Sequence, residues 1–245
     1  MKKLLVMILS LCLVLSCVSA LADTLTMGTN AHFPPYEYYE GDTIIGIDAE
    51  IAGLIAEKLG MELEIIDVEF DTLVAGVEEG KFDIAMAGMT VTEKRLLSVS
   101  FSTSYATGIQ SIIVPEGSAI TSVDDLYAEG ASYLIGVQQG TTGDIYCSDD
   151  FGEDHVMKYK TGNEAVMALC AGKLDCVIID DQPAKAYVAA NEGLTILDSE
   201  YTLEEYAIAI SYDKPELLEQ VNAALEELIA DGTVQAVLDK YITAD

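Results

Sequence analysis

The stretch GKFDIAMAGMTVTEKR, residues 80–95, begins at a helix-ending glycine, continues as an apolar strand over residues 82–87 and finishes in a polar turn. Upstream of it we expect a strand at residues 24–29, a helix at 47–59, a strand at 61–68 and a helix at 71–79, from the period of the apolar residues. The first ninety residues therefore alternate strand and helix, and this order predicts an α/β sheet.

A second unit of the same kind starts near residue 110. Its expected elements, in chain order, are strand 110–114, helix 122–127, strand 133–137, helix 142–146, strand 156–159, helix 163–171, strand 176–180 and helix 182–191. A strand at 206–212 and helices at 216–230 and 234–241 follow, the first of these helices behind Pro215. Because no linker rich in Pro, Gly or Ser separates the units, we expect strands to join them and a ligand cleft to lie between them.

Residues 1–22 have the pattern of a signal peptide, in which two lysines precede an apolar run and small residues mark the cleavage site. We therefore expect an exported protein, in the periplasm or at the cell surface. The sequence VLSC before and including Cys17 also permits lipid anchoring, and the sequence leaves open which processing occurs.

The charge and the cysteine content exclude several classes of partner. Removal of residues 1–22 would take away two lysines and no acid, which changes the formal net charge from −30 to −32. Such a charge excludes nucleic acid as a partner, since nucleic-acid binding relies on Lys and Arg. The remaining cysteines lack metal-ligand spacing, so we expect neither a metal nor another cofactor. Whether Cys170 and Cys176 are bridged stays open.

Polar stretches follow several of the expected strands, at the sheet edge where ligands bind in open α/β folds. Arg95 is the only arginine of the chain, and its planar fork of donors suits a carboxylate, although a surface ion pair explains it equally well. Residues 138–142, QQGTT, suit an anion at a helix N-terminus, although an ordinary helix cap is the alternative. Asp180 could accept hydrogen bonds from an ammonium group. Two prolines in residues 29–38 stiffen a loop that presents Phe33.

Together these stretches resemble the amino-acid solute-binding proteins of ABC importers, the periplasmic binding proteins of the type 2 fold, also called bacterial extracellular solute-binding protein family 3. The resemblance spans residues 23–245, and Ala49 is its one noted departure. The segments that carry it are TNAHFPPYEY (29–38), GIDAEIAGLIAEKLG (46–60), GKFDIAMAGMTVTEKR (80–95), FSTSY (101–105), IGVQQGTT (135–142), AGKLDCVIIDDQPAKAY (171–187) and EEYAIAI (204–210).

The resemblance implies two α/β lobes joined by two crossover strands, near residues 105–109 and 203–206. Lobe 1 would comprise residues 24–107 and 207–245, and lobe 2 residues 108–206. A hinge movement would close the lobes over the ligand.

The resemblance also implies a zwitterion clamp. Arg95, Thr90 and the Thr142 amide would hold a carboxylate, while Asp180 and the Gly88 carbonyl would hold the α-ammonium group. The implied ligand-binding residues are Asn30, Phe33, Phe70, Gly88, Met89, Thr90, Arg95, Gln138, Thr142 and Asp180. Among them Asn30, Phe70, Met89 and Gln138, together with His32 and Gln139, would vary with specificity.

The function implied is capture of a free L-amino acid by a monomeric protein that is not an enzyme, and delivery of that amino acid to the transmembrane subunits of an ABC permease. The amides of Asn30 and Gln138 favour a polar uncharged ligand such as glutamine, and basic amino acids and cystine remain open. A sensor of amino acids and a cyclohexadienyl dehydratase-like enzyme on the same fold are the alternatives.

Overall fold

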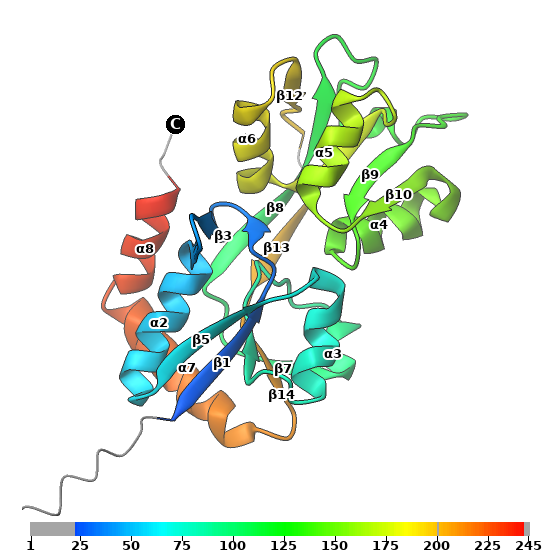
Figure 1. The fold of residues 1–245 in the computed structure, drawn as a ribbon. Helices are drawn as coiled ribbons and strands as arrows, with labels where there is room; N and C mark the ends of the chain where they lie inside the picture. Colours follow the sequence, from blue (N-terminus) through cyan, green and yellow to red (C-terminus); the bar gives the residue numbers. More distant parts are fainter. Residues whose placement is uncertain (1–22, 200, 243–245) are drawn as a thin grey trace, which may run out of the picture.

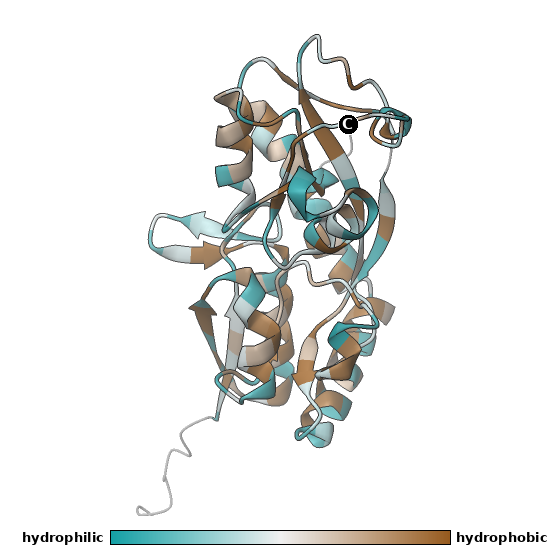
Figure 2. Cartoon of the chain, turned by 90° about the vertical axis from the view of Figure 1, so that its right-hand side faces the viewer, coloured by the Kyte–Doolittle hydropathy of each residue, from teal (hydrophilic) through white to brown (hydrophobic). Residues whose placement is uncertain are grey.

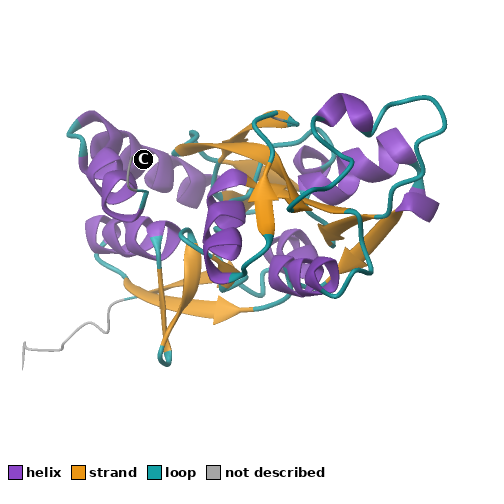
Figure 3. Cartoon of the chain, turned by 90° about the horizontal axis from the view of Figure 1, so that it is seen from above, coloured by secondary structure: helices purple, strands orange, loops and turns teal. Residues whose placement is uncertain are grey.

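The computed structural model describes residues 23–199 and 201–242, which form two α/β lobes (Figure 1). The predicted signal peptide and the possible anchor at Cys17 lie outside the described residues. Each lobe is built around one sheet with helices on its faces, and Figure 3 shows the helices on both sides of the strands. The α/β class predicted from the strand and helix order is confirmed.

Lobe 1 contains a five-stranded sheet in the order β5-β1-β6-β14-β7. Strand β1 pairs in parallel with β5 and β6, and β14 pairs antiparallel with β6 and β7. Its strands are β1 (Thr24–Thr29), β5 (Glu62–Asp67), β6 (Ile84–Ala85), β7 (Val99–Phe101) and β14 (Ala209–Ser211). Its helices are α2 (Ile47–Leu59), α3 (Leu73–Glu78), α7 (Pro215–Ala230) and α8 (Thr233–Tyr241). A small sheet beside them consists of β2 (His32–Phe33), β3 (Glu37–Glu40) and β4 (Thr43–Ile45).

Lobe 2 contains the sheet β10-β9-β11-β8-β12, with β13 also paired to β8. Its strands are β8 (Ala106–Pro115), β9 (Ile135–Gln138), β10 (Val156–Tyr159), β11 (Cys176–Asp180), β12 (Leu194–Ile196) and β13 (Thr202–Tyr206). Its helices are α4 (Thr142–Phe151), α5 (Gly162–Cys170) and α6 (Asp181–Ala190). Short 3-10 turns complete the chain at η1 (Phe70–Thr72), η2 (Arg95–Leu97), η3 (Val123–Asp125) and η4 (Glu153–His155).

Strands β8 and β13 connect the lobes, and Figure 1 shows both passing from one lobe to the other. They run antiparallel, with Ile109 opposite Leu203 and Ala106 opposite Tyr206. This pair lies where the two crossover strands were expected. The lobe limits after residues 107 and 206 stay a prediction.

Several of the predicted elements differ from the structure, including the three described next. The expected helix at 122–127 is only the turn η3, which a capping box between Ser122 and Asp125 closes. The expected strand at 206–212 is two strands, because β13 ends in the lobe 2 sheet and β14 starts in the lobe 1 sheet. The expected strand at 82–87 is reduced to β6, although its apolar residues are buried.

Apolar residues fill the inside of each lobe, as the brown segments of the strands and helices in Figure 2 show. In α2, Ile47, Ile51 and Ile55 are fully buried at helical spacing. In lobe 2, Cys147 and Cys176 are buried and Cys170 is exposed, and all three are free thiols. Among the described residues no helix has both the length and the apolar character that crossing a membrane requires.

Candidate functional site

A cavity between the lobes brings together most of the predicted ligand-binding residues. The enclosed space measures about 10 Å³, which is roughly the room for one water molecule. An amino acid would therefore need more room than the two lobes leave here. The cavity is lined by Asn30, Phe33, Glu37, Phe70, Ala87, Gly88, Thr90, Arg95, Gln138, Thr141, Thr142 and Asp180.

Of the predicted residues, only Met89 does not reach this cavity. Its side chain is fully buried in an apolar cluster of lobe 1 with Phe70 and Leu73, and its carbonyl accepts a hydrogen bond from the Ala207 amide. Its two chain neighbours, Gly88 and Thr90, both line the cavity, whereas the Met89 side chain lies in the core of lobe 1.

Arg95 lies at the boundary between the lobes. Its Nη1 donates a hydrogen bond to the Thr90 carbonyl (2.7 Å) in lobe 1, and its Nη2 donates to the Gly140 carbonyl (3.2 Å) in lobe 2. The guanidinium carbon lies 5.3 Å from the centre of the Phe70 ring. Burial lowers the pKa of Arg95, and the nearby charge of Glu204 opposes this change. Arg95 therefore places a desolvated positive charge at the cavity, with two donors held in a fixed direction.

Asp180 lies at the end of β11, where the sequence placed it, and is 6% exposed. Its Oδ1 accepts a hydrogen bond from the Tyr206 hydroxyl, and its Oδ2 accepts one from Gln110 Nε2 (2.8 Å). Burial, followed by the charge of Glu204, raises the pKa of Asp180 well above its usual value. Because Tyr206 and Gln110 belong to the crossover strands, the hinge itself orients this carboxyl group.

Gly88 is held in place by a buried carboxyl group. Its amide donates to Asp48 Oδ2 (2.8 Å), and Asp48 Oδ1 accepts from the Tyr105 hydroxyl (2.7 Å). Burial raises the pKa of Asp48 to about 6. The φ angle of Gly88 is 51°, and a Cβ there would lie 2.8 Å from the Phe33 ring, so this turn needs a glycine.

Glu37 lines the cavity with a fully buried side chain. Neither of its carboxyl oxygens meets a donor among the described residues, and Asp48 lies beside it. Two carboxylates cannot donate to each other, so a hydrogen bond between Glu37 and Asp48 requires a proton on one of them. Burial and then the charge of Asp48 raise the pKa of Glu37 well above its usual value. Glu37 thus lines the cavity with carboxyl oxygens that could accept hydrogen bonds from a donor group of a solute.

The amides of Asn30 and Gln138 hydrogen-bond to each other across the lobes. Gln138 Nε2 donates to Asn30 Oδ1 (2.9 Å), and Asn30 Nδ2 donates to the Val68 carbonyl (2.7 Å). Gln138 Nε2 also reaches the Lys160 carbonyl (3.2 Å). In this arrangement both the oxygen and the nitrogen of the Asn30 side chain form hydrogen bonds within the protein.

The N-terminus of α4 closes the lobe 2 side of the cavity. Thr141 is the N-cap, and its hydroxyl oxygen accepts a hydrogen bond from the Asp144 amide (3.3 Å). Thr142 is the first residue of α4 and lies 3.4 Å from Gln110 Nε2 through its hydroxyl oxygen. The helix-cap and anion-site interpretations of this stretch are therefore compatible, because the N-terminal amides and the cap lie at the cavity together.

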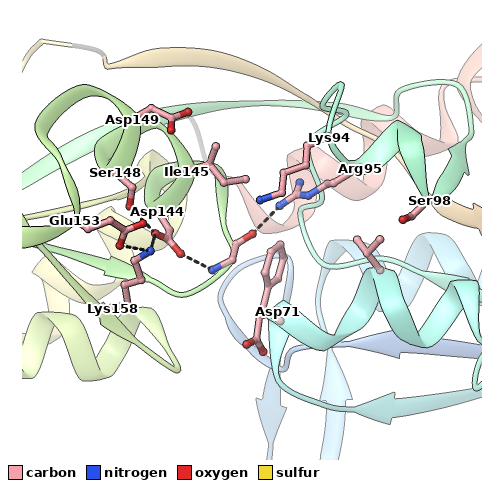
Figure 4. A pocket seen from close by; sticks show the side chains of 13 residues that line it. Asp71, Lys94, Arg95, Ser98, Asp144, Ile145, Ser148, Asp149, Glu153 and Lys158 are labelled. Atoms are coloured by element: carbon pink, nitrogen blue, oxygen red, sulfur yellow. Dashed lines mark hydrogen bonds and ion pairs between the residues drawn. The ribbon is translucent and has the colours of Figure 1, made fainter.

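A larger hollow of about 550 Å³ adjoins the cavity on the outer side of Arg95 (Figure 4). Phe70, Arg95 and Gly140 line this hollow, and the first two also line the cavity. On its lobe 2 wall, Lys158 forms ion pairs with Asp144 and Glu153. Phe70 and Arg95 therefore lie between the two spaces.

Further contacts between the lobes lie around the cavity. Gln139 donates to Asp71, Lys160 pairs with Glu69, and the Tyr187 hydroxyl donates to the His32 carbonyl. His32 and Gln139, which the resemblance placed among the specificity positions, thus contact the opposite lobe, His32 through its backbone. Neither lines the cavity.

Sequence reasoning missed Glu37 and the hinge residues Gln110, Glu204 and Tyr206. Glu37 falls inside the stretch at residues 29–38, but nothing in the pattern shows that it is buried. Glu204 and Tyr206 alternate with exposed residues in β13, which is a signal for one buried face. Among the described residues, no group of three or more His, Cys, Asp or Glu is placed to hold a metal ion.

Residues 25–244 match the model of the bacterial extracellular solute-binding proteins, family 3. The chain belongs to this family. It is 30% identical to the arginine-binding extracellular protein ArtP of Bacillus subtilis (strain 168), with all of both chains covered. The fold matches the substrate-binding protein of an amino acid ABC transporter with a TM-score of 0.84 and 32% identity, over 90% of this chain and 100% of that chain. It also matches an ancestral arginine-binding protein bound to glutamine, with a TM-score of 0.83 and 35% identity, over 90% of this chain and 98% of that chain.

Membership in family 3 establishes an exported solute-binding protein and agrees with the predicted absence of enzyme activity, since the matched relatives are named as binding proteins. The cavity described above lies between the two lobes, where the ligand cleft is predicted from the sequence.

Proposed function

We propose that this protein captures a free L-amino acid between its lobes, as a monomer, and delivers it to the transmembrane subunits of an ABC permease. The observation that carries the proposal is the pairing of one buried cation with one buried acid across a single small cavity. Arg95 and Asp180 both line it, from different lobes. A guanidinium suits a carboxylate and a carboxylate suits an ammonium group, so the pair matches the two charges that every free amino acid carries.

The neighbouring groups support the same orientation of the ligand. Arg95, Thr90 and the N-terminus of α4 at Thr142 provide donors for the carboxylate. Asp180 and the Gly88 carbonyl provide acceptors for the α-ammonium group. Phe33 and Phe70 supply apolar surface for the carbon chain between the charges and the side-chain end.

The excess of buried acids supports a basic side chain on the ligand. Among the described residues, Arg95 is the one buried basic side chain, whereas Glu37, Asp48, Asp180 and Glu204 are all buried nearby. Asp180 and Arg95 are used by the ligand's α-groups, which leaves Glu37 at the cavity without a donor. A guanidinium or ammonium group at the end of the ligand side chain would provide one, and its charge would counteract the raised pKa of Glu37 by favouring the ionised form. The similarity to proteins named for binding arginine agrees with this choice.

Glutamine is the second candidate, because the amides of Asn30 and Gln138 both line the cavity. The hydrogen bond between Gln138 Nε2 and Asn30 Oδ1 would have to break before either side chain could bind the amide group of the ligand through these atoms. A solved structure of similar fold, an ancestral arginine-binding protein, is bound to glutamine, which supports glutamine as a candidate ligand beside arginine.

A thermal-shift screen over the twenty amino acids, followed by calorimetry on each hit, tests the proposal, because a ligand that binds only the native state raises Tm. We expect a rise with arginine or lysine that exceeds the rise with glutamine. A larger rise with glutamine would support the second candidate. No rise with any amino acid would contradict the proposed function, and turnover of prephenate or arogenate would favour an enzyme instead.

A further inference from the structure

Glu204 is a buried acid on the crossover strand β13 that touches both lobes without lining the cavity. It is 3% exposed, and its neighbour Glu205 is exposed on the opposite face of the strand. Its Oε2 accepts a hydrogen bond from the hydroxyl of Thr90 (3.0 Å), a lobe 1 residue that lines the cavity. The same oxygen accepts one from Gln110 Nε2 (3.1 Å), on the other crossover strand.

Gln110 extends this connection to the ammonium half of the clamp. Its Nε2 donates to Asp180 Oδ2 (2.8 Å) and lies 3.4 Å from the hydroxyl oxygen of Thr142. One carboxyl oxygen of Glu204 thus fixes Thr90 directly and Asp180 through a single amide. The chain of contacts passes entirely through the hinge and spans both halves of the clamp.

Stability of the fold is a poor explanation for an acid at this position. Glu204 Oε1 and Gln110 Oε1 are both buried with no hydrogen-bond partner among the described residues. Burying such oxygens costs free energy, and replacing a buried ionic group by an apolar one is often neutral or stabilising. The acid therefore has a role that an apolar side chain would not perform.

The charge of Glu204 acts on both residues of the clamp. Apart from burial, it is the largest influence on the pKa of Arg95 and on that of Asp180. It favours the charged form of Arg95 and disfavours the charged form of Asp180. The other titratable or charged groups that interact with Asp180 are Tyr206 of β13, Asp181 of α6, Arg95 of η2, Glu37 of β3, and Tyr36.

We propose that Glu204 is a positioning residue of the ligand clamp, which holds Thr90 and Asp180 in register across the hinge and sets the charge balance between Arg95 and Asp180. This inference rests on the proposed capture of an amino acid by Arg95 and Asp180. It assigns to the hinge strand a role in ligand affinity in addition to joining the lobes.

Three variants separate this role from a purely structural one. Glu204→Ala removes both hydrogen bonds and the charge, and we expect the Kd of the amino acid to rise by about tenfold or more. Glu204→Gln keeps an acceptor oxygen and removes the charge, so it restores most of the affinity at neutral pH. Because Asp180 then has one fewer charged neighbour, the pH below which affinity is lost moves to a lower value. Glu205→Ala is the matched control and leaves both quantities unchanged.

The measurements are calorimetric titrations with the amino acid that binds the wild-type protein, from neutral to acidic pH, together with Tm of each variant without ligand. A lower Tm of Glu204→Ala with an unchanged Kd would show a structural role only and would overturn the inference. If Glu204→Ala does not fold, Glu204→Gln decides, and an unmoved acid limit would overturn it. If the wild-type protein binds no amino acid, this result would contradict the proposed function, and the inference about Glu204 would fall with it.

Discussion

Arg95 and Gly140 join the two lobes directly, through the hydrogen bond from Arg95 Nη2 to the Gly140 carbonyl over 3.2 Å. The same guanidinium holds the Thr90 carbonyl in its own lobe. A carboxylate that enters between the lobes would meet donors already aimed at the lobe boundary, and closure would then add the lobe 2 contacts. This relationship links the binding of the ligand to the position of the lobes.

Replacing Arg95 by alanine is expected to abolish most of the binding. Without the guanidinium, the ligand carboxylate would be buried without a cation, which costs about 2–5 kcal/mol of binding free energy and raises Kd by roughly 30-fold or more. Calorimetry on Arg95→Ala measures the loss. Lys94→Ala is the control, because Lys94 is exposed beside Arg95 and lines only the outer hollow. Near-normal affinity of Arg95→Ala would contradict the assignment of Arg95 to the carboxylate.

The affinity is expected to fall as the pH falls, starting at a higher pH than an ordinary aspartic acid would cause. The ammonium group needs Asp180 in its charged form, and burial with the charge of Glu204 raises the pKa of this acid above its ordinary value of 3.8. Below the raised pKa, a proton must leave before the ligand binds, so Kd increases. Calorimetry at several pH values gives the profile. Asp180→Asn should bind weakly with a flatter profile, and an equally steep profile in that variant would exclude Asp180 as the cause.

Asp48 is expected to make the folded protein less stable as the pH rises from about 4 to 6. Its pKa is about 6 in the folded protein against an ordinary value of 3.8, so the folded state holds a proton that the unfolded state has released. The stabilisation is complete below the unfolded pKa and is lost as the pH passes the folded pKa, by about 2–3 kcal/mol in total. Asp48→Asn should remove this dependence. Parallel unfolding free energies of both proteins across this window would contradict the prediction.

Gly108→Ala is expected to weaken ligand binding. A Cβ at this position would lie 2.1 Å from the Tyr206 hydroxyl oxygen and 2.8 Å from Asp180 Oδ1, so the hydrogen bond between them must shift. Such overpacking typically costs about 1–3 kcal/mol of stability. Gly53→Ala is the matched control. Apart from its chain neighbours and the backbone of its own helix, no described atom lies within 4 Å of a Cβ at Gly53, and this residue lies in α2, where alanine is the better helix former. The measurements are Tm and Kd of both variants. We expect a higher Kd for Gly108→Ala and an unchanged Kd for Gly53→Ala, and an unchanged Kd for Gly108→Ala would contradict the prediction.

The ion pair between Lys160 and Glu69 is expected to contribute little to affinity, although it joins the lobes. Both side chains are at least half exposed, so solvent and salt screen the attraction. Glu69→Gln should change Kd by less than about fivefold. The measurement is calorimetry at low and at physiological salt, with Glu79→Gln as the control, because Glu79 forms a comparable exposed pair with Lys81 inside lobe 1. A large loss of affinity would mean that this pair holds the lobes together.

Much of the fold could be predicted because local patterns and tertiary packing agree. Helix α2 has the predicted bounds, since its apolar period places Ile47, Ile51 and Ile55 on one buried face. The expected strand at 206–212 was wrong because Tyr206 ends β13 in the lobe 2 sheet while residues 209–211 form β14 in the lobe 1 sheet, and residues 206–210 are buried throughout. Apolar content reports burial and carries no information on which sheet the strand joins.

The sequence by itself determined the α/β class, the family resemblance, the position of Asp180 at the end of a strand and that of Arg95 in the polar segment after a strand, because these depend on residue order and on local periodicity. Only the tertiary structure decided that Glu37 lies at the cavity, that Met89 turns into the core, and that Glu204 reaches Thr90 and Gln110 from the hinge. These are contacts between residues far apart in the chain, and they depend on how the two sheets are placed against each other.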